Sequence, residues 1–398
     1  MSEANDLLFN RNLAQTTPFP LGIEVERAEG IYIYDVHGKR YADLISGIGV
    51  SSLGHNRKEI VAAIREQATK FLHVMVYGEF IQKPQTEFAQ LLSSALPENL
   101  NTVYFVNSGA EAIEASLKLA KRVTGRTKII SCKKSYHGNT HGALSVSGNE
   151  MKKYAFRPLL PDVYFINFNS FSDLEKIDNE TACFIMETVQ GDAGVRIPDL
   201  TYMKALRKRC DEVGALLIFD EIQCGMGRTG KMFAFEHFDV VPDILSLGKA
   251  LGGGLPIGAC ISSLSNMRHF TSDPILGHIT TFGGHPLVCA SGHAALRVLI
   301  SQNILAGVDE KGRRIKNILT QHPSVREVRQ IGLFIAVDLE SEDQVRRLVD
   351  RCLEKGILIF WFLSCPSSFR LAPPLTIGNE EIDRHLGEIC EILDEIRT

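Results

Sequence analysis

Residues Leu216–Gln223 have the sequence LLIFDEIQ, a run of four apolar residues that ends in two acids. An apolar run without polar alternation is typical of a strand buried on both faces of a parallel sheet. Six further runs of this kind occur in the chain: Thr102–Val106, Lys128–Cys132, Val163–Ile166, Cys183–Met186, Asp243–Leu247 and Ala259–Ser262. Patterns of helical period separate them, such as Glu111–Val123 and Leu200–Val213. This alternation predicts an α/β fold built on a mostly parallel sheet flanked by helices.

The two ends of the chain differ from this middle part. Residues Ile31–Ser46 have a strand–turn–strand pattern, and a long helical pattern begins after Pro286. The strand candidates that follow it are Glu327–Asp338 and Gly356–Phe362. We therefore expect a smaller α+β domain formed by residues 1–48 and 288–398, beside a large domain of residues 49–287.

Composition excludes several classes of function. The 398 residues carry a net charge of −4 with acids and bases mixed throughout, which leaves no basic surface for nucleic acid or a membrane. No apolar stretch approaches the roughly 20 residues of a membrane-spanning helix, and the opening MSEANDLLFNRN lacks the pattern of a signal peptide. The nine cysteines include no CxxC pair and are expected to be reduced thiols. We therefore expect a cytoplasmic globular protein.

Two polar residues follow predicted strands, where ligands bind in open α/β sheets. Asp220 is placed to hold a protonated ring nitrogen if a cationic partner keeps it ionised despite burial; a solvated acid pair is the alternative. Lys249 lies two residues past a predicted strand and precedes three glycines, Gly252–Gly254. A lysine removed from water has a lowered pKa and can attack a carbonyl, although a surface lysine in a glycine-rich turn would look similar.

The segment Val106–Ala115, with the sequence VNSGAEAIEA, joins a predicted strand to a predicted helix. Its small residues, free N–H groups and Ser108 hydroxyl suit an anion at a helix N-terminus. The commoner alternative is an ordinary N-cap at Ser108 with Glu111 in the first turn. A weaker signal is Ile279–Pro286, ITTFGGHP, where two threonine hydroxyls precede a Gly–Gly turn.

Two other motifs point to different chemistry. Gly225–Gly230, GMGRTG, matches the dinucleotide fingerprint, but DEIQC separates it from the preceding strand and no helical pattern follows. An NAD-dependent oxidoreductase is therefore only a remote alternative. His137 and His141 have the spacing of a metal pair on a helix, yet Gly138 intervenes and no third ligand is evident. We assign no metal.

The motifs together resemble the class III aminotransferases, a family that includes acetylornithine, ornithine and 4-aminobutyrate aminotransferases. The motifs are VNSGAEAIEASLKLAK, SYHGNTHGALS, METVQGDAG, LLIFDEIQCGMGRTGKMFAFEHF, PDILSLGKALGGGLPIG and TTFGGHP. The resemblance covers Gly22 to Asp383, and the opening of the chain is most similar to the acetylornithine/ornithine branch. It implies the fold of type I pyridoxal-phosphate (PLP) enzymes, with a seven-stranded sheet in the large domain.

The resemblance also implies a reaction. A terminal (ω) amine would give its amino group to PLP and a 2-keto acid would then accept it, in ping-pong order. The alternatives within the family are a pyruvate-dependent ω-transaminase, a β-amino acid aminotransferase and an aminomutase, and a decarboxylase would use the same scaffold.

Residue roles follow from matching positions in the family. Lys249 is expected to form the Schiff base and to move the proton, and Asp220 to pair with the pyridine nitrogen. The other expected cofactor contacts are Ser108, Gly109 and Ala110 at the phosphate, Tyr136 stacked on the ring with His137 beside it, and Gln223 near the ring hydroxyl. Thr281 is expected to reach the phosphate of a partner subunit, which implies a homodimer with shared active sites. The expected substrate contacts are Asn139, Glu187, Asp192 and Arg370.

Three positions depart from the family pattern. Asn139 stands where the acetylornithine/ornithine branch has an arginine that binds a substrate carboxylate. Asp192 replaces a glutamate that gates the arginine of the RLAPPL segment, here Arg370, and His285 replaces an asparagine. The first two changes bear on which substrate binds, and none of the three affects the cofactor site.

Overall fold

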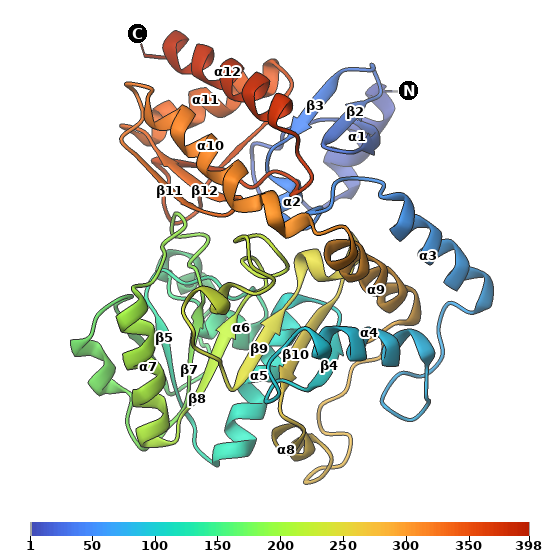
Figure 1. Cartoon of the computed structure of the whole chain (residues 1–398), viewed down its shortest axis with the longest axis vertical. Helices are drawn as coiled ribbons and strands as arrows, with labels where there is room; N and C mark the ends of the chain where they lie inside the picture. The colour runs from blue at the N-terminus through green and yellow to red at the C-terminus, as the bar shows by residue number, and fades with distance from the viewer. Residues whose placement is uncertain (1, 398) are drawn as a thin grey trace.

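The computed structural model describes residues 2–397, in which a seven-stranded sheet lies below two four-stranded sheets (Figure 1). In spatial order the large sheet contains β4 (Thr102–Val106), β10 (Gly258–Ser262), β9 (Ile244–Leu247), β8 (Leu216–Asp220), β7 (Thr181–Glu187), β5 (Lys128–Cys132) and β6 (Val163–Ile166). Strands β5 to β9 run parallel, and β10 is antiparallel to both of its neighbours. The predicted mostly parallel sheet is confirmed.

Both faces of this sheet are buried, as the apolar runs predicted. On β8, Ile218 packs into a cluster with α5 (Gly109–Thr124), while Leu217 and Phe219 belong to the larger core on the other face. The remaining α-helices are α1 (Ser2–Asn12), α2 (Ser46–Gly49), α3 (Lys58–Lys70), α4 (Lys83–Ser94), α6 (His141–Val146), α7 (Leu200–Val213), α8 (Leu264–Met267), α9 (Pro286–Ser301), α10 (Val308–Thr320), α11 (Glu342–Glu354) and α12 (Asn379–Glu395).

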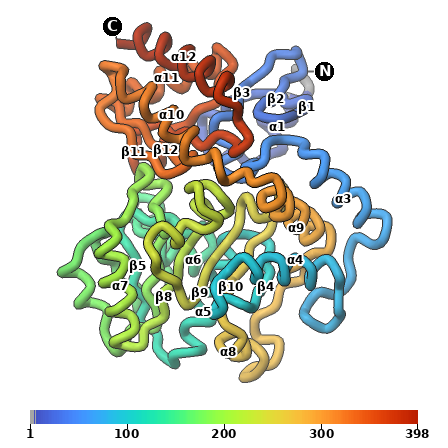
Figure 2. The backbone as a smooth tube through the Cα atoms, in the orientation of Figure 1, coloured from blue at the N-terminus to red at the C-terminus, as the bar shows by residue number. Residues whose placement is uncertain are grey.

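The small sheets are made from both ends of the chain, which lie side by side in Figure 2. One contains β1 (Val25–Glu29), β2 (Tyr32–Asp35), β3 (Arg40–Asp43) and β13 (Ile357–Leu358); the other contains β11 (Glu327–Ile331), β12 (Phe334–Asp338), β15 (Ser368–Leu371) and β14 (Phe360–Trp361). Strand β13 pairs in parallel with β3 and so ties the two ends together. The domain boundaries at residues 48 and 287 stay a prediction that this arrangement supports.

Both strand candidates near the C-terminus divide in two. The run Glu327–Asp338 forms the hairpin of β11 and β12, because Gly332 adopts a positive φ of 55° that turns the chain back. The run Gly356–Phe362 contributes β13 to one small sheet and β14 to the other. The sequence located these segments as strand candidates, but it did not reveal the breaks within them.

The GMGRTG motif has a structural role in this fold. It folds as consecutive turns rather than as the start of a helix. The buried guanidinium of Arg228 donates to the carbonyls of Leu333 (3.0 Å) and Pro373 (2.6 Å) and to Ser52 Oγ (3.0 Å). Arg228 thus connects the loop that follows β8 to segments from both ends of the chain.

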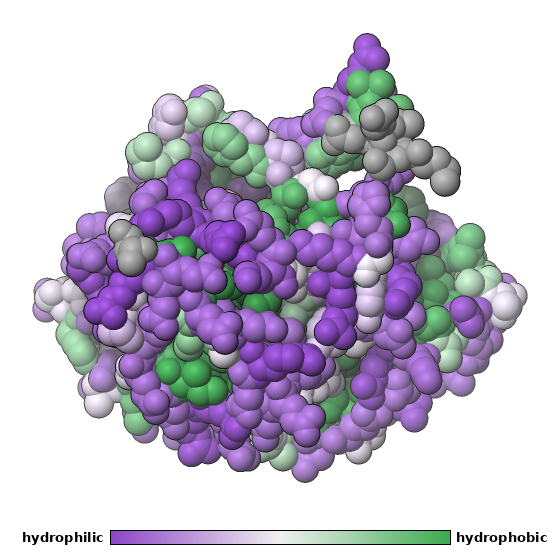
Figure 3. Space-filling view, turned by 90° about the horizontal axis from the view of Figure 1, so that it is seen from above, coloured by the Kyte–Doolittle hydropathy of each residue, from purple (hydrophilic) through white to green (hydrophobic). Residues whose placement is uncertain are grey.

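Three further observations concern the cysteines, the helices and the surface of the described residues. All nine cysteines lie within the described residues, and none forms a disulfide. Among residues 2–397, no helix combines the length and the apolar character needed to cross a bilayer. Seen from the end that carries the small sheets, the surface is largely hydrophilic, with hydrophobic residues in separate patches (Figure 3).

Candidate active site

The candidate site lies at the carboxyl ends of β7, β8 and β9. Glu187, the last residue of β7, is in register with Asp220, the last residue of β8, and Asp220 pairs with Ser246 of β9. Lys249 follows three residues later. A cavity of about 550 Å³ opens at this edge. Its lining residues are Gly109, Ala110, Tyr136, His137, Gly138, Asn139, Thr140, Glu187, Val189, Asp220, Ile222, Gln223, Cys224 and Lys249.

Asp220 is almost fully buried and is held by two donors. One oxygen lies 2.7 Å from Nδ1 of His137, and the other accepts from the backbone N–H of Ile222 at 3.0 Å. His137 is itself positioned by its backbone N–H, which donates to Ser147 Oγ (3.0 Å). The buried Nε2 of His137 has no hydrogen-bond partner among the described residues. His137 and the N–H of Ile222 therefore supply hydrogen-bond partners to both oxygens of the buried Asp220.

Lys249 approaches the same cavity from the turn after β9. Burial lowers the pKa of its amine, the charges of Asp220 and Glu187 act in the opposite direction, and Arg370 lowers it further. The side chain passes close to Gly49, where an added Cβ would lie 3.9 Å from Lys249 Cδ and from Gln223 Cγ. A lowered pKa increases the fraction of neutral amine, which is the nucleophilic form.

Glu187 connects two loops at the edge of the cavity. Its oxygens accept from the backbone N–H groups of Tyr136 and Gly191, both at 3.0 Å. Burial raises the pKa of Glu187 to about 7, the charge of His137 lowers it, and that of Asp220 raises it. Because both oxygens are engaged by the backbone, Glu187 fixes the position of Tyr136 relative to the loop that carries Asp192.

The start of α5 forms the third wall of the site. Ser108 caps this helix, since its Oγ accepts from the N–H of Glu111 at 3.1 Å, and its hydroxyl proton stays available to another acceptor. The next residues, Gly109 and Ala110, line the cavity, and the first N–H groups of a helix have no partner within it. Capping and an anion site are therefore compatible at this helix terminus.

Side chains at the mouth of the cavity include Tyr136 and Asn139. Asn139 is exposed, and its Nδ2 donates to Tyr136 Oη at 3.3 Å. Burial raises the pKa of Tyr136, so its hydroxyl stays neutral near pH 7. Gln223 also lines the cavity. It packs directly against Gly191, because an added Cβ on Gly191 would lie 2.5 Å from Gln223 Oε1.

Four of the predicted residues lie outside this lining: Ser108, Asp192, Thr281 and Arg370. Arg370 of β15 is buried with Cζ 4.4 Å from the centre of the Phe362 ring, and its Nη2 is 3.5 Å from Asp192 Oδ1. Thr281 is exposed, and its carbonyl accepts from His73 Nε2 at 3.1 Å. The expected contact of Thr281 with a partner subunit stays a prediction.

Sequence reasoning missed several residues of the site. Ile222 lines the cavity and packs against two glycines, because an added Cβ would lie 2.8 Å from its Cγ2 at Gly109 and 3.2 Å at Gly248. Nothing in the sequence DEIQ distinguishes Ile222 from the residues beside it. Asn149 and Ser364 form hydrogen bonds that lead to Asp192, and nothing in the sequence relates positions so far apart.

The combined donor set suits a flat, anionic, heteroaromatic cofactor. The site offers a buried carboxylate for a ring N–H, an amine of lowered pKa for an aldehyde, an aromatic side chain and a helix N-terminus for a phosphate. These are the groups that PLP requires, so the residues present fit this cofactor.

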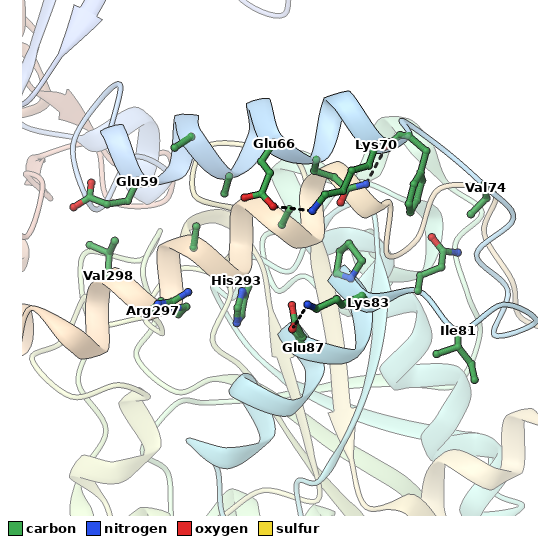
Figure 4. Close-up of a pocket in the computed structure, with 18 of the residues that line it drawn as sticks. Glu59, Glu66, Lys70, Val74, Ile81, Lys83, Glu87, His293, Arg297 and Val298 are labelled. Carbon is green, nitrogen blue, oxygen red and sulfur yellow. Dashed lines mark hydrogen bonds and ion pairs between the residues drawn. The ribbon is translucent and has the colours of Figure 1, made fainter.

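A larger cavity, of about 790 Å³, lies between α3, α4 and α9 (Figure 4). Four of its charged side chains pair along their own helices, Lys70 with Glu66 at 2.7 Å and Lys83 with Glu87 at 3.4 Å. Such exposed pairs one helical turn apart are typical of a solvated helix surface. We therefore place the chemistry at the smaller cavity.

Comparisons with known proteins agree with this geometry. The family model for class-III aminotransferases matches residues 14–393. An acetylornithine aminotransferase from Methanopyrus kandleri is 38% identical, over 98% of this chain and 99% of the relative. A [LysW]-aminoadipate semialdehyde/glutamate semialdehyde transaminase from Sulfolobus acidocaldarius is 39% identical over 85% of this chain and 86% of the relative. The solved ornithine aminotransferase of Toxoplasma gondii superposes with a TM-score of 0.92 at 28% identity, over 100% of this chain and 96% of that one.

The pKa of Glu187 predicts a pH-dependent contribution to stability. The carboxyl loses its proton near 4.5 in the unfolded chain and near 7 in the folded one, so stability that is present below pH 4.5 is lost as pH rises through 7. Glu187→Gln cannot titrate, and its amide nitrogen faces one of the two backbone N–H groups, which lowers its stability by a similar amount at every pH. The difference in stability between wild type and the variant should therefore shift by about 3 kcal/mol in favour of the variant between pH 4.5 and 7. Urea unfolding at successive pH values measures the difference.

The exposed Glu180→Gln is the matched control and should follow wild type at every pH. A constant difference between Glu187→Gln and wild type from pH 4.5 to 8 would contradict the raised pKa.

Proposed function

This chain belongs to the class III aminotransferase family and is a PLP-dependent transferase of amino groups, and we propose that its donor is a terminal amine and its acceptor a 2-keto acid. The observation that carries the proposal is the meeting of Lys249, Asp220 and the start of α5 at one cavity. The relatives are named as aminotransferases of acetylornithine and of ornithine and as a transaminase of [LysW]-aminoadipate semialdehyde and glutamate semialdehyde. These names support a donor whose reacting amine is at the end of a carbon chain.

Lys249 is the proposed catalytic residue. When bound, PLP supplies an aldehyde that condenses with amines and a protonated ring that takes up electron density from the substrate carbon. Lys249 Nζ would hold the cofactor at rest and, once a substrate amine has replaced it, would remove a proton from the substrate carbon and return one nearby. A pKa lowered by burial suits this task, because the neutral amine is a base.

Asp220 is proposed to hold the proton of the cofactor ring nitrogen. His137 and the N–H of Ile222 fix its two oxygens in place, so the carboxylate need not reorganise when the substrate reacts. Ser108, Gly109 and Ala110 would bind the phosphate, Tyr136 would lie against the ring, and Gln223 would approach its hydroxyl. These residues would together position the cofactor.

We further propose a homodimer in the cytoplasm. Thr281 lies in an exposed loop that carries exposed apolar side chains, among them Ile275 and Phe282, and it does not line the cavity of its own chain. An exposed apolar surface beside a hydroxyl suited to phosphate binding supports a second subunit there. The unpaired cysteines suit a reducing compartment.

The first test is the donor half-reaction. Purified enzyme with PLP, given ornithine, N-acetylornithine or 4-aminobutyrate without an acceptor, should release one carbonyl product per active site and no CO₂. Release of CO₂, or rearranged amine without a carbonyl product, would replace transamination by a decarboxylase or aminomutase reaction.

Asp220→Asn should slow this half-reaction more than tenfold, about 1.4 kcal/mol of barrier, because an amide cannot stabilise a ring N–H⁺. A variant within tenfold of wild type would remove Asp220 from the ring nitrogen.

Asn139 should determine how the enzyme treats a second carboxylate. A guanidinium binds a carboxylate with full charge and two hydrogen bonds, whereas an amide offers neutral donors, a difference of about 1 kcal/mol or more. We expect Asn139→Arg to favour 2-oxoglutarate over pyruvate by about tenfold in kcat/KM relative to wild type. If wild type already prefers 2-oxoglutarate strongly and the arginine changes nothing, Asn139 does not face the carboxylate.

A further inference from the structure

The carboxylate of Asp192 is held by the turn between β14 and β15. Its Oδ2 accepts from Ser364 Oγ at 2.7 Å and its Oδ1 accepts from the N–H of Leu363 at 3.1 Å. The guanidinium of Arg370 approaches the same Oδ1 only to 3.5 Å. Charge-assisted hydrogen bonds are usually 2.7–2.9 Å long, so the turn satisfies Asp192 better than Arg370 does.

Ser364 is oriented from its other side by Asn149. The Nδ2 of Asn149 donates to Ser364 Oγ at 2.9 Å, and the Oδ1 of Asn149 accepts from the N–H of Met151 at 3.1 Å. A hydroxyl has one proton to donate. Because the amide of Asn149 already donates to the oxygen, the proton of Ser364 is directed to Asp192.

Arg370 is left with unused donor capacity. Its side chain is 6% exposed, and its buried Nε has no hydrogen-bond partner among the described residues. A buried guanidinium with an unmade hydrogen bond is costly unless an anion completes it. Arg370 contacts Asp192, and the neighbouring Gly191 packs against Gln223 of the cavity lining, since an added Cβ on Gly191 would lie 2.5 Å from Gln223 Oε1.

We propose that Asn149 and Ser364 are positioning residues that keep the contact between Asp192 and Arg370 long, at 3.5 Å, and so leave the guanidinium available to a substrate carboxylate. A keto acid, or a donor with a carboxylate beside its reacting carbon, then binds without first displacing Asp192. The inference rests on the proposed function, since it requires a carboxylate substrate at the Lys249 cavity. It assigns to this chain a preset carboxylate site where Asp192 does not act as a closing group.

The test compares the holoenzyme with Ser364→Ala by calorimetric titration of glutarate, a dicarboxylate that cannot react. Without the hydroxyl, Asp192 turns to Arg370 and competes with the ligand, so the Kd of glutarate should rise about tenfold. Its neutral analogue glutaramide should bind both proteins alike. The KM for 2-oxoglutarate should rise with the Kd of glutarate, while kcat stays within about twofold.

Further variants separate positioning from a general loss of structure. Ser364→Thr keeps the hydroxyl and Ser367→Ala changes the same turn, so both should bind glutarate like wild type. The double variant Ser364→Ala with Asp192→Asn should regain the wild-type Kd, because the competing charge is gone. Asp192→Glu is an independent test in case Ser364→Ala does not fold. Its side chain is one methylene longer, so it should reach Arg370 and weaken glutarate binding.

Three results would overturn the inference: an unchanged Kd in both Ser364→Ala and Asp192→Glu, no recovery in the double variant, or no glutarate binding by wild type. Failure of the proposed function shows separately, as the absence of carbonyl product from the wild-type donor half-reaction.

Discussion

The carboxylate of Asp220 lies buried at the end of β8, where an unpartnered charge would be strongly disfavoured. Its hydrogen bonds to His137 Nδ1 and to the N–H of Ile222 compensate for that burial. The strand register then places Glu187 beside it, and Glu187 holds the Tyr136 loop. Lys249 reaches the same cavity from the turn after the next strand, so the burial of Asp220 and the strand register bring these side chains together.

The substrate side of the site depends on how the chain ends fold. Arg370 and Ser364 come from the C-terminal sheet, whereas Asp192 and Asn149 belong to loops of the large sheet. Arg228 donates to Ser52, Leu333 and Pro373 and thereby fixes both chain ends against the loop after β8. In the proposed account the carboxylate site is therefore shared between the two sheets, whereas Asp220 and Lys249 belong to the large sheet alone.

The sequence predicted the large sheet and the positions of Asp220 and Lys249 because those signals are local: an apolar run and the residues that follow it. It located the small-sheet strands less well, since Gly332 divides the single strand candidate Glu327–Asp338 into two strands. The hydrogen bond between His137 and Asp220 joins residues 83 apart, and that between Asn149 and Ser364 joins residues 215 apart. Such contacts depend on strand register and on the packing of both chain ends, which no single segment encodes.

The central claim is that Lys249 carries the cofactor. Borohydride reduces the C=N bond between a lysine and PLP to a stable amine, so digestion and mass spectrometry of the reduced protein locate the lysine. The account predicts one modified peptide, carrying the reduced cofactor on Lys249, and no label in Lys249→Ala. Label on a different lysine, or undiminished label in Lys249→Ala, would contradict it.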